Sequence, residues 1–215
     1  MSQSLNIDSL LYLPWVLFHR KLAVPHLSIN NISDIDPTAF NEMGFKGIIF
    51  DKDNTLTAPY CNTFHPLIEN CINNYKEAFP EKLAIFSNSA GTLDDLNGSD
   101  AQQLELQLGI PVIRHKRKKP NGITEVLQHF NCQPHELVII GDRTFTDIVF
   151  GNRFGLLTVR TRQFTATGDN AAAKFAYKQE NKLLGRWIKS GIKPPAQKLL
   201  NESFLKKIHK VESEN

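Results

Sequence analysis

The 215-residue sequence is poor in cysteine and in long apolar runs, and each shortage excludes a class of protein. Its three cysteines, at positions 61, 71 and 132, form no CxxC pair. A structural zinc site or a disulfide framework is therefore not expected, and a reducing compartment fits best. The longest apolar run, Leu10 to Phe18, is interrupted by Pro14 and falls short of the roughly 20 apolar residues that span a bilayer. It also lacks the basic start and small-residue cleavage site of a secretory signal.

Charge is distributed unevenly along the chain. The net charge of +3 excludes a polycation, and we expect no nucleic-acid partner. From Lys174 onward, however, basic residues far outnumber the acidic ones, and residues 114–119 form a second basic run. Such runs either form solvated faces or attract an anion such as acidic lipid, and the sequence leaves both readings open.

The middle of the chain alternates short apolar runs with amphipathic stretches. Strands are predicted at 45–50, 83–86, 110–113, 137–140 and 156–159, with helices at 67–79, 102–108, 121–130 and 145–154. Pro111 suggests that the third strand lies at a sheet edge. Strands that are apolar on both faces and alternate with helices indicate a doubly wound, Rossmann-like parallel α/β sheet.

This pattern divides the chain into three parts. We expect an N-terminal apolar, amphipathic segment in contact with a membrane (1–29), an α/β core (30–165) and a basic helical C-terminal extension (166–215). The extension reads as a helical pair at 172–190 and 197–210.

Polar residues follow the predicted strands at the points where the strands end. The first strand is followed by Asp51-Lys52-Asp53-Asn54-Thr55, the second by Ser87-Asn88-Ser89, and the fourth by Gly141-Asp142-Arg143-Thr144-Phe145-Thr146-Asp147, while Lys119-Pro120 begins the helix after the third. Because the carboxyl ends of parallel strands meet in one crevice, we expect these groups to form one site.

The chemistry of this set points to phosphoryl transfer. Asp51, Asp53 and Asp142 would repel one another unless a cation neutralised them, and Mg²⁺ takes such oxygen ligands while leaving positions for water and phosphate. A carboxylate can attack phosphorus to form an aspartyl-phosphate, and the Ser87 hydroxyl and Lys119 ammonium suit phosphoryl oxygens. Other readings stay open: Ser87-Asn88 as a helix N-cap, Asn54-Thr55 as loop-shaping residues, and Arg143 in contact with either substrate or solvent.

The segments DKDNTLT, FSNS, Lys-Pro and GDRTFTD resemble, in order, the four motifs of the haloacid dehalogenase superfamily. The resemblance implies that Asp51 is the nucleophile and that Asp53 is the general acid and base. It further implies an Mg²⁺ ion held by Asp51, Asp142 and the backbone carbonyl of Asp53. Substrate binding is expected from Ser87, Asn88 and Lys119, and a supporting role from Thr55 and Asp147.

The gaps between these motifs have room for crossover helices and not for an inserted cap domain. An uncapped, open site suits a bulky substrate: a protein, a nucleic acid or a lipid head group. The DKDNTLT, SNSAG, KKP and GDRxxTD segments resemble more closely the mitochondrial phosphatidylglycerophosphate phosphatases and their bacterial relatives. This implies a phospholipid substrate, converted to phosphatidylglycerol on the route to cardiolipin, and a peripheral position on the matrix side of the mitochondrial inner membrane. Residues 1–8 contain no Arg, unlike a typical presequence, so this location rests on the resemblance.

Several alternatives remain at the level of sequence. Leu10 to Phe18 either packs on the core or lies in a bilayer interface beside anionic lipid, and the same pair of readings holds for Trp187. The chain could instead be a soluble phosphatase for a protein or nucleotide phosphate, or a catalytically silent interaction module. Neither the oligomeric state nor the acyl-chain preference follows from the sequence.

Overall fold

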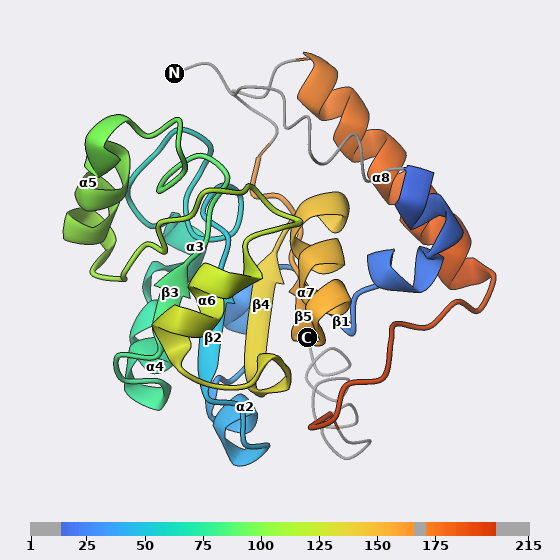
Figure 1. Ribbon diagram of the computed structural model, residues 1–215, viewed down its shortest axis with the longest axis horizontal. Helices are drawn as coiled ribbons and strands as arrows, with labels where there is room; N and C mark the ends of the chain where they lie inside the picture. The colour runs from blue at the N-terminus through green and yellow to red at the C-terminus, as the bar shows by residue number, and fades with distance from the viewer. Residues whose placement is uncertain (1–13, 166–170, 201–215) are drawn as a thin grey trace.

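A five-stranded, all-parallel sheet forms the centre of the protein, seen in a computed structural model that describes residues 14–165 and 171–200 (Figure 1). The strands are β1 (Leu27–Ser28), β2 (Gly47–Phe50), β3 (Leu83–Ile85), β4 (Leu137–Gly141) and β5 (Leu157–Arg160), in the spatial order β1-β5-β4-β2-β3. The predicted α/β fold with a Rossmann-like parallel sheet is confirmed.

Helices cover both faces of this sheet. They are α2 (Thr38–Glu42), α3 (Pro66–Glu69), α4 (Ile72–Ala78), α5 (Ser99–Leu108), α6 (Ile123–Phe130), α7 (Val149–Phe154) and α8 (Ala171–Lys189), with short turns η1 (Arg20–Ala23), η2 (Ile32–Asp34), η3 (Leu96–Gly98) and η4 (Pro134–Glu136) and the π-helix η5 (Thr144–Ile148). The helix predicted at 67–79 is therefore two short helices, and the one predicted at 145–154 begins as a π-helix. Gly109 ends α5 with a φ of 62°, as expected of a glycine C-cap.

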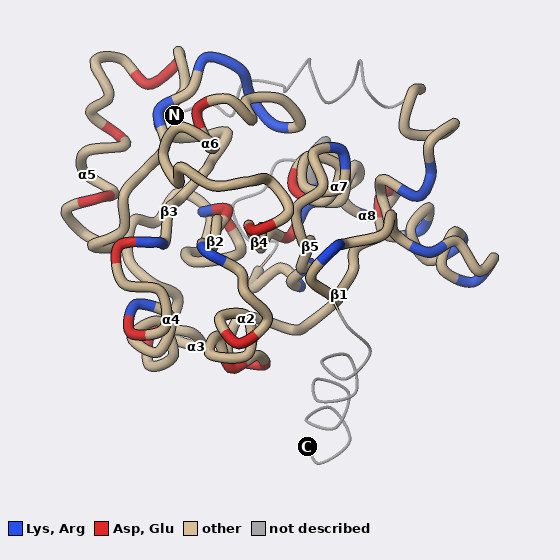
Figure 2. Tube along the Cα trace, turned by 60° about the horizontal axis from the view of Figure 1, so that its bottom comes forward, with Lys and Arg blue, Asp and Glu red and all other residues tan. Residues whose placement is uncertain are grey.

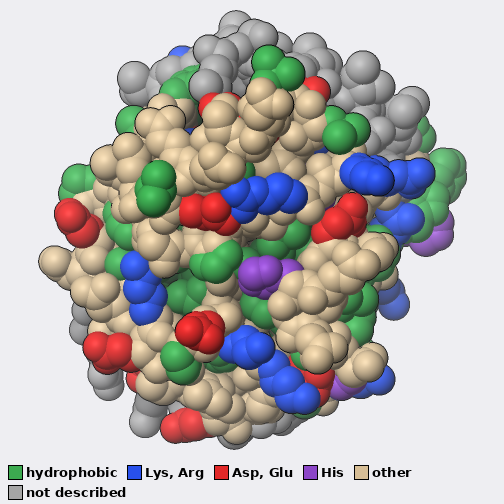
Figure 3. All heavy atoms as spheres, turned by 60° about the vertical axis from the view of Figure 1, so that its left-hand side comes forward, with side chains coloured by type: hydrophobic (Ala, Val, Ile, Leu, Met, Phe, Trp, Pro, Cys, Tyr) green, Lys and Arg blue, Asp and Glu red, His purple; other side chains and the backbone are tan. Residues whose placement is uncertain are grey.

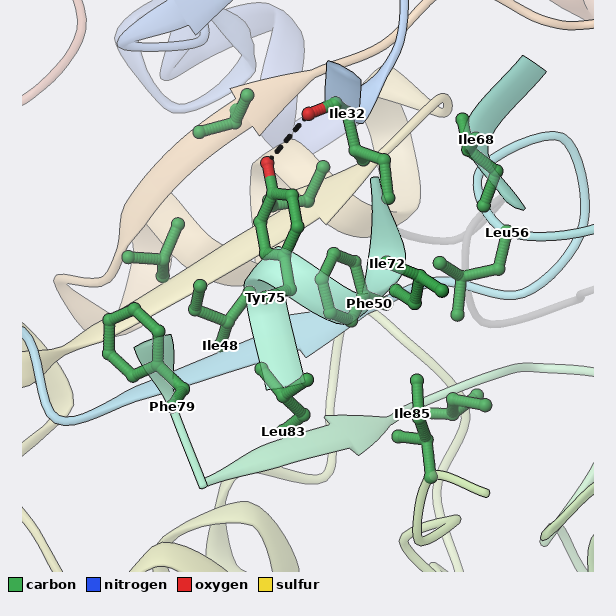
Figure 4. Packing of buried hydrophobic residues seen from close by; sticks show 14 of the residues in the cluster. Ile32, Ile48, Phe50, Leu56, Ile68, Ile72, Tyr75, Phe79, Leu83 and Ile85 are labelled. Atoms are coloured by element: carbon green, nitrogen blue, oxygen red, sulfur yellow. Dashed lines mark hydrogen bonds between the residues drawn. The ribbon is translucent and has the colours of Figure 1, made fainter. Parts of the chain in front are cut away.

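Side-chain alternation along the strands builds two cores. Ile48 and Phe50 point into a cluster with α2, α4 and α5, whereas Ile49 points into a second cluster with α6 and α7. In the first cluster Tyr75 is fully buried, and its hydroxyl donates a hydrogen bond to the Ile32 carbonyl at 2.8 Å (Figure 4). This bond fixes the chain before β2 to helix α4.

The prediction of a strand at 110–113 is wrong, because these residues are not part of the regular sheet. Residues 110–113 lie beside β3, at the predicted edge, but form only an isolated bridge between Ile85 and Val112. The Pro111 carbonyl accepts from the Ile85 N–H, and the Ile85 carbonyl accepts from the Ile113 N–H. Since proline has no N–H, Pro111 cannot donate a further bond to β3, and pairing is limited to these two bonds.

The opposite edge strand comes from a segment that the sequence placed outside the core. Leu27 and Ser28 of β1 pair with Val159 and Arg160 of β5. Before β1, the helical residues 14–18 and η1 pack on α8 through a third apolar cluster that includes Val16, Ala23 and Trp187. The first helix of the predicted C-terminal pair is confirmed as α8, and most of the second lies outside the described residues.

Candidate active site

The loop after β2 carries the predicted nucleophile at a fixed place. The Asp51 N–H donates to the Ile140 carbonyl of β4 at 2.8 Å, so Asp51 continues the ladder that holds the two strands together. The chain then turns at Asn54, whose φ of 61° is a left-handed value that Asn tolerates better than most residues. The Asn54 N–H donates to the Thr57 carbonyl, and Thr55 is fully buried. These bonds support the prediction that Asn54 and Thr55 shape the loop.

Lys119 reaches this loop from the segment that precedes α6. Its ammonium lies 2.6 Å from Asp51 Oδ1 and 2.5 Å from Asp147 Oδ1, and the side chain is buried. Burial alone would lower the pKa of Lys119, but the negative charges of Asp147 and Asp51 raise it above its ordinary value. Lys119 therefore carries a fixed positive charge next to the nucleophile.

Asn88 holds Lys119 in place through the backbone. Its side-chain carbonyl accepts from the Lys119 N–H at 2.7 Å, and its amide donates to the Lys119 carbonyl at 3.3 Å. The structure thus gives the Asn88 side chain a positioning role, while a direct contact of Asn88 with substrate stays a prediction.

Three carboxylates converge beside Lys119. Asp51, Asp142 and Asp147 are all buried, and each offers an oxygen that lies within 4.8 Å of the others. Burial raises the pKa of Asp51 to about 7, with Lys119 opposing the rise and Asp147 adding to it. Burial also raises the pKa of Asp142 well above its ordinary value, and the charges of Asp51 and Asp147 act in the same direction. The cluster holds more negative charge than Lys119 alone can balance.

Such a cluster fits a hard divalent cation. Its members are oxygen donors, and the raised pKa values of Asp51 and Asp142 mark negative charges that a cation would stabilise. Mg²⁺ typically takes one or two carboxylates and keeps other positions for water and a phosphate. The predicted ligands Asp51 and Asp142 lie in this cluster. The Asp53 side chain does not, and a metal contact through its backbone carbonyl stays a prediction.

Asp147 approaches the site because Gly141 has no side chain. A Cβ at position 141 would lie 2.5 Å from the Asp147 carboxyl carbon, which is closer than real Cβ contacts. Asp147 belongs to the π-helix η5, and its Oδ2 accepts from the Arg143 N–H at 3.1 Å. Wider π-helical turns often occur at functional sites, and here one directs a carboxylate back to the end of β4.

Asp53 lies apart from the three carboxylates and is held by two groups that the sequence did not single out for this role. Lys52 donates to Asp53 Oδ1 at 2.8 Å, and the Ser89 hydroxyl donates to Oδ2 at 2.9 Å. The Ser87 and Ser89 hydroxyls are in turn 2.9 Å apart. Ser87 is therefore linked to Asp53 through Ser89. The spacing of two residues between the serines was a signal for this arrangement, because it permits a local turn in which the Ser87 hydroxyl accepts from the Ser89 N–H at 3.1 Å.

Two further contacts tie the end of β4 to the C-terminal part of the chain. Gln163 donates to Asp142 Oδ2 at 2.9 Å. The Arg143 guanidinium pairs with Glu180 of α8 at 2.7 Å, a partner that the sequence did not indicate. Partners this far apart along the chain leave no local pattern that sequence reasoning could detect.

The mouth of the site carries no inserted domain. Between Asp53 and Ser87 the chain forms only α3, α4 and β3, and between Ser87 and Lys119 only η3 and α5. Within residues 14–165, the prediction of an uncapped site therefore agrees with the structure.

Comparison with known proteins gives a consistent group of relatives. Residues 7–164 match the family described as Mitochondrial PGP phosphatase. The chain is 40% identical over 94% of its length to "Phosphatidylglycerophosphate phosphatase 1, chloroplastic/mitochondrial" of Arabidopsis thaliana, and spans 59% of that protein. It is 41% identical over 84% of its length to "Phosphatidylglycerophosphate phosphatase 1, chloroplastic" of Chlamydomonas reinhardtii, and spans 68% of it. It is 32% identical over 82% of its length to "Phosphatidylglycerophosphatase GEP4, mitochondrial" of Saccharomyces cerevisiae, of which it covers 98%.

A solved structure also resembles this chain. It is that of an uncharacterized protein from Listeria monocytogenes serotype 4b, with a TM-score of 0.42 and 17% identity, covering 64% of this chain and 98% of the other.

Proposed function

Since this chain belongs to the mitochondrial PGP phosphatase family, we propose that it is an Mg²⁺-dependent phosphatase that hydrolyses phosphatidylglycerophosphate to phosphatidylglycerol and phosphate. The observation that carries the chemistry is the buried contact of Asp51 with Lys119, next to Asp142 and Asp147. It supplies a nucleophile, a fixed positive charge and an acidic cluster at one edge of the sheet.

In the first step, a carboxylate oxygen of Asp51 attacks the phosphorus of the terminal phosphomonoester. The ester P–O bond breaks, and the leaving glycerol oxygen takes a proton from Asp53. Lys52 and Ser89 each donate a hydrogen bond to one oxygen of Asp53, and these two bonds fix the orientation of its carboxyl group. Lys119, and the Ser87 hydroxyl, are suited to contact phosphoryl oxygens, which gain negative charge in the transition state.

In the second step, a water molecule attacks the phosphorus of the aspartyl-phosphate. Asp53 takes the proton of this water, the bond between phosphorus and the Asp51 oxygen breaks, and inorganic phosphate leaves. Both Asp51 and Asp53 return to their starting states. Each proton that Asp53 gives to the leaving group is thus recovered from the attacking water.

Asp51, Asp142 and the backbone carbonyl of Asp53 would hold the Mg²⁺ ion, with Asp147 in support. When bound, the ion supplies positive charge that lets an anionic carboxylate approach an anionic phosphate. The raised pKa values of Asp51 and Asp142 support this assignment, because a cation in the cluster would stabilise their ionised forms.

The open mouth supports a lipid substrate. A cap that closes over the phosphate would exclude a diacyl lipid whose chains remain in a bilayer, whereas an uncapped strand end can reach a head group at the membrane surface. No helix among the described residues is both long and apolar enough to cross a bilayer. From the mitochondrial names of the family and of its relatives, we propose a peripheral enzyme on the matrix side of the mitochondrial inner membrane, acting in cardiolipin synthesis. The location is checked by carbonate extraction and protease protection of isolated mitochondria.

The test is phosphate release from phosphatidylglycerophosphate in mixed micelles, with and without Mg²⁺. We compare the wild type with Asp51→Asn and with the control Asp100→Asn, which changes a carboxylate on α5 outside the site. We expect release only with Mg²⁺, its loss in Asp51→Asn and its retention in the control. A wild type that ignores this lipid but hydrolyses an aryl phosphate through Asp51 would support the alternative of a soluble phosphatase. If Mg²⁺-dependent turnover is absent for every phosphate ester tested, the chain is a silent interaction module.

A further inference from the structure

The helical residues 14–18, η1 and α8 form one layer on the side of the protein next to β5 and α7 (Figure 1). Val16, Leu184 and Trp187 are buried in the apolar cluster that joins these segments to Val149. The sequence left packing and membrane contact open for a segment near each end of the chain, and the described parts of these two segments pack as a single unit. We call this unit the α8 layer.

The outward side of the α8 layer exposes large apolar side chains. Phe18 is 87% exposed, and Trp15, Leu17, Phe175 and Ile188 are also exposed. Val16 and Trp187 point inward while their neighbours Leu17 and Ile188 remain outside. The structure thus confirms packing on the core for one side of this part of the chain, and it leaves the other side exposed.

Basic residues dominate the same layer. On α8, the exposed residues Lys174, Lys178, Lys182, Arg186 and Lys189 follow one another at intervals of four, four, four and three positions. This spacing places them on one stripe of the helix. Arg20 and Lys21 lie on the adjoining η1.

Acidic residues are nearly absent from these segments. Between positions 14 and 24 and between 171 and 193, Glu180 is the one acidic residue, and it is buried against Arg143. Figure 2 shows the contrast: Lys and Arg colour the α8 side, while most Asp and Glu lie on the side of α2, α4 and α5. The face drawn in Figure 3, on the α5 side, mixes both signs with scattered hydrophobic side chains. A positive stripe beside exposed aromatic side chains is complementary to an anionic bilayer surface.

The buried side of α8 is attached to the active site. Glu180 accepts from Arg143 and from the Thr144 N–H, and Asn181 accepts from Arg160 at 2.6 Å. Arg143 follows Asp142 directly in the chain, and Arg160 donates to the Asp142 carbonyl at 3.1 Å. A surface bound through α8 therefore lies close to the loop that carries Asp142.

We propose that the outward side of the α8 layer docks on an anionic phospholipid bilayer and holds the active site at the head-group level. The proposal deepens the proposed function and rests on it for the reason why a bilayer is needed. The occupant is a lipid surface, because the pairing of a cationic stripe with single aromatic and aliphatic side chains matches anionic head groups above hydrocarbon.

The test is co-sedimentation of the full chain with vesicles of phosphatidylcholine alone or with about 30% phosphatidylserine, an anionic lipid that is neither the proposed substrate nor the product. Two variants probe the layer: Phe18→Ser, and Lys178→Gln with Lys182→Gln. Two matched controls lie elsewhere: Leu106→Ser on α5, at the same 87% exposure as Phe18, and Lys82→Gln with Lys116→Gln, which removes the same charge from exposed positions. Hydrolysis of a soluble aryl phosphate reports whether each variant keeps its fold and its site.

We expect binding to the anionic vesicles to fall about tenfold or more in both layer variants and to stay near the wild type in both controls. Aryl phosphate hydrolysis should be unchanged in all four. The proposal would be overturned if the layer variants bound anionic vesicles as well as the wild type, or if the controls lost as much binding as the layer variants. It would also be overturned if the wild type bound neutral and anionic vesicles equally. If the protein binds vesicles as expected but leaves phosphatidylglycerophosphate intact in micelles, the docking surface stands and the proposed substrate falls. If the wild type hydrolyses the lipid in micelles but does not bind vesicles, the proposed substrate stands and the docking surface falls.

Discussion

Replacement of Glu180 by Gln should loosen α8 from the active site. The Glu180 carboxylate accepts from Arg143 Nη2 at 2.7 Å, from Arg143 Nε at 3.3 Å and from the Thr144 N–H at 3.2 Å. The Glu180 side chain is 5% exposed and that of Arg143 is 31% exposed. The change keeps the shape of the side chain, removes its negative charge and leaves the Arg143 guanidinium without an anionic partner.

The expected loss of stability follows from this partial burial. Removal of one partner from a fully buried ion pair costs about 3–5 kcal/mol, because the other charge remains buried. Here water reaches the guanidinium, and the Gln amide oxygen can still accept one bond, so we expect about 1–3 kcal/mol. For a chain of this size, each kcal/mol lowers Tm by about 2–4 °C.

Urea unfolding of the wild type, Glu180→Gln, Arg143→Gln and the double variant measures the coupling between the two residues. We expect the two single losses not to add, with an interaction energy of about 1 kcal/mol or more. Asp94→Asn is the control, since it removes the partner of Lys118 from a pair in which the Asp94 side chain is 65% exposed. That change should cost less than about 1 kcal/mol. Additive single losses within about 0.5 kcal/mol, or a loss no greater than that of the control, would show that the pair does not hold α8 in place.

Three further predictions concern the site itself. Gln163→Ala removes the donor to Asp142 and should raise the Mg²⁺ concentration for half-maximal activity about 10–100-fold, and an unchanged Mg²⁺ titration would refute this role. Asn88→Ala removes two hydrogen bonds to the Lys119 backbone and should lower kcat about tenfold with little change in the Mg²⁺ titration. A similar change in kcat and in the Mg²⁺ concentration for half-maximal activity would contradict this positioning role. Burial raises the folded-state pKa of Asp51 from 3.8 to about 7 and that of Asp142 well above 3.8, so the metal-free protein loses stability from these groups as pH rises through that window. Mg²⁺ needs the ionised forms, so the rise in Tm on adding Mg²⁺ should be larger at about pH 7.5 than at about pH 5.5, and a rise that is the same at both would exclude these carboxylates as ligands.

The site could be predicted from the sequence because its residues follow strands. Asp51, Ser87 and Asp142 come directly after β2, β3 and β4 or one residue beyond, and strand ends in a parallel sheet meet at one edge. Asp147 was expected near them from the resemblance of the GDRTFTD segment to a known motif. The structure adds that Asp147 lies as close to Lys119 as Asp51 does, which the motif spacing alone did not reveal.

The remainder of the arrangement depends on contacts that leave no local pattern. β1 consists of Leu27 and Ser28 only, too short a run for alternation to show, and it forms because the β5 edge offers unpaired backbone groups. The strand predicted at 110–113 failed for the opposite reason, since an apolar run was present but Pro111 limited its pairing. Likewise, the bond from Gln163 to Asp142 joins residues on different elements, and only the folded chain brings them together.

Gly141 has a consequence for how this protein can vary. It brings no functional group to the reaction, yet a methyl group at this position would occupy the space of the Asp147 carboxyl group. Even alanine, the smallest replacement, would therefore displace that carboxylate from Lys119 and act as a substitution of Asp147 itself. In a complete survey of single substitutions scored by enzyme activity, position 141 should reject every side chain and follow the profile of position 147. An empty volume at this strand end is thus as necessary to the site as the charges around it.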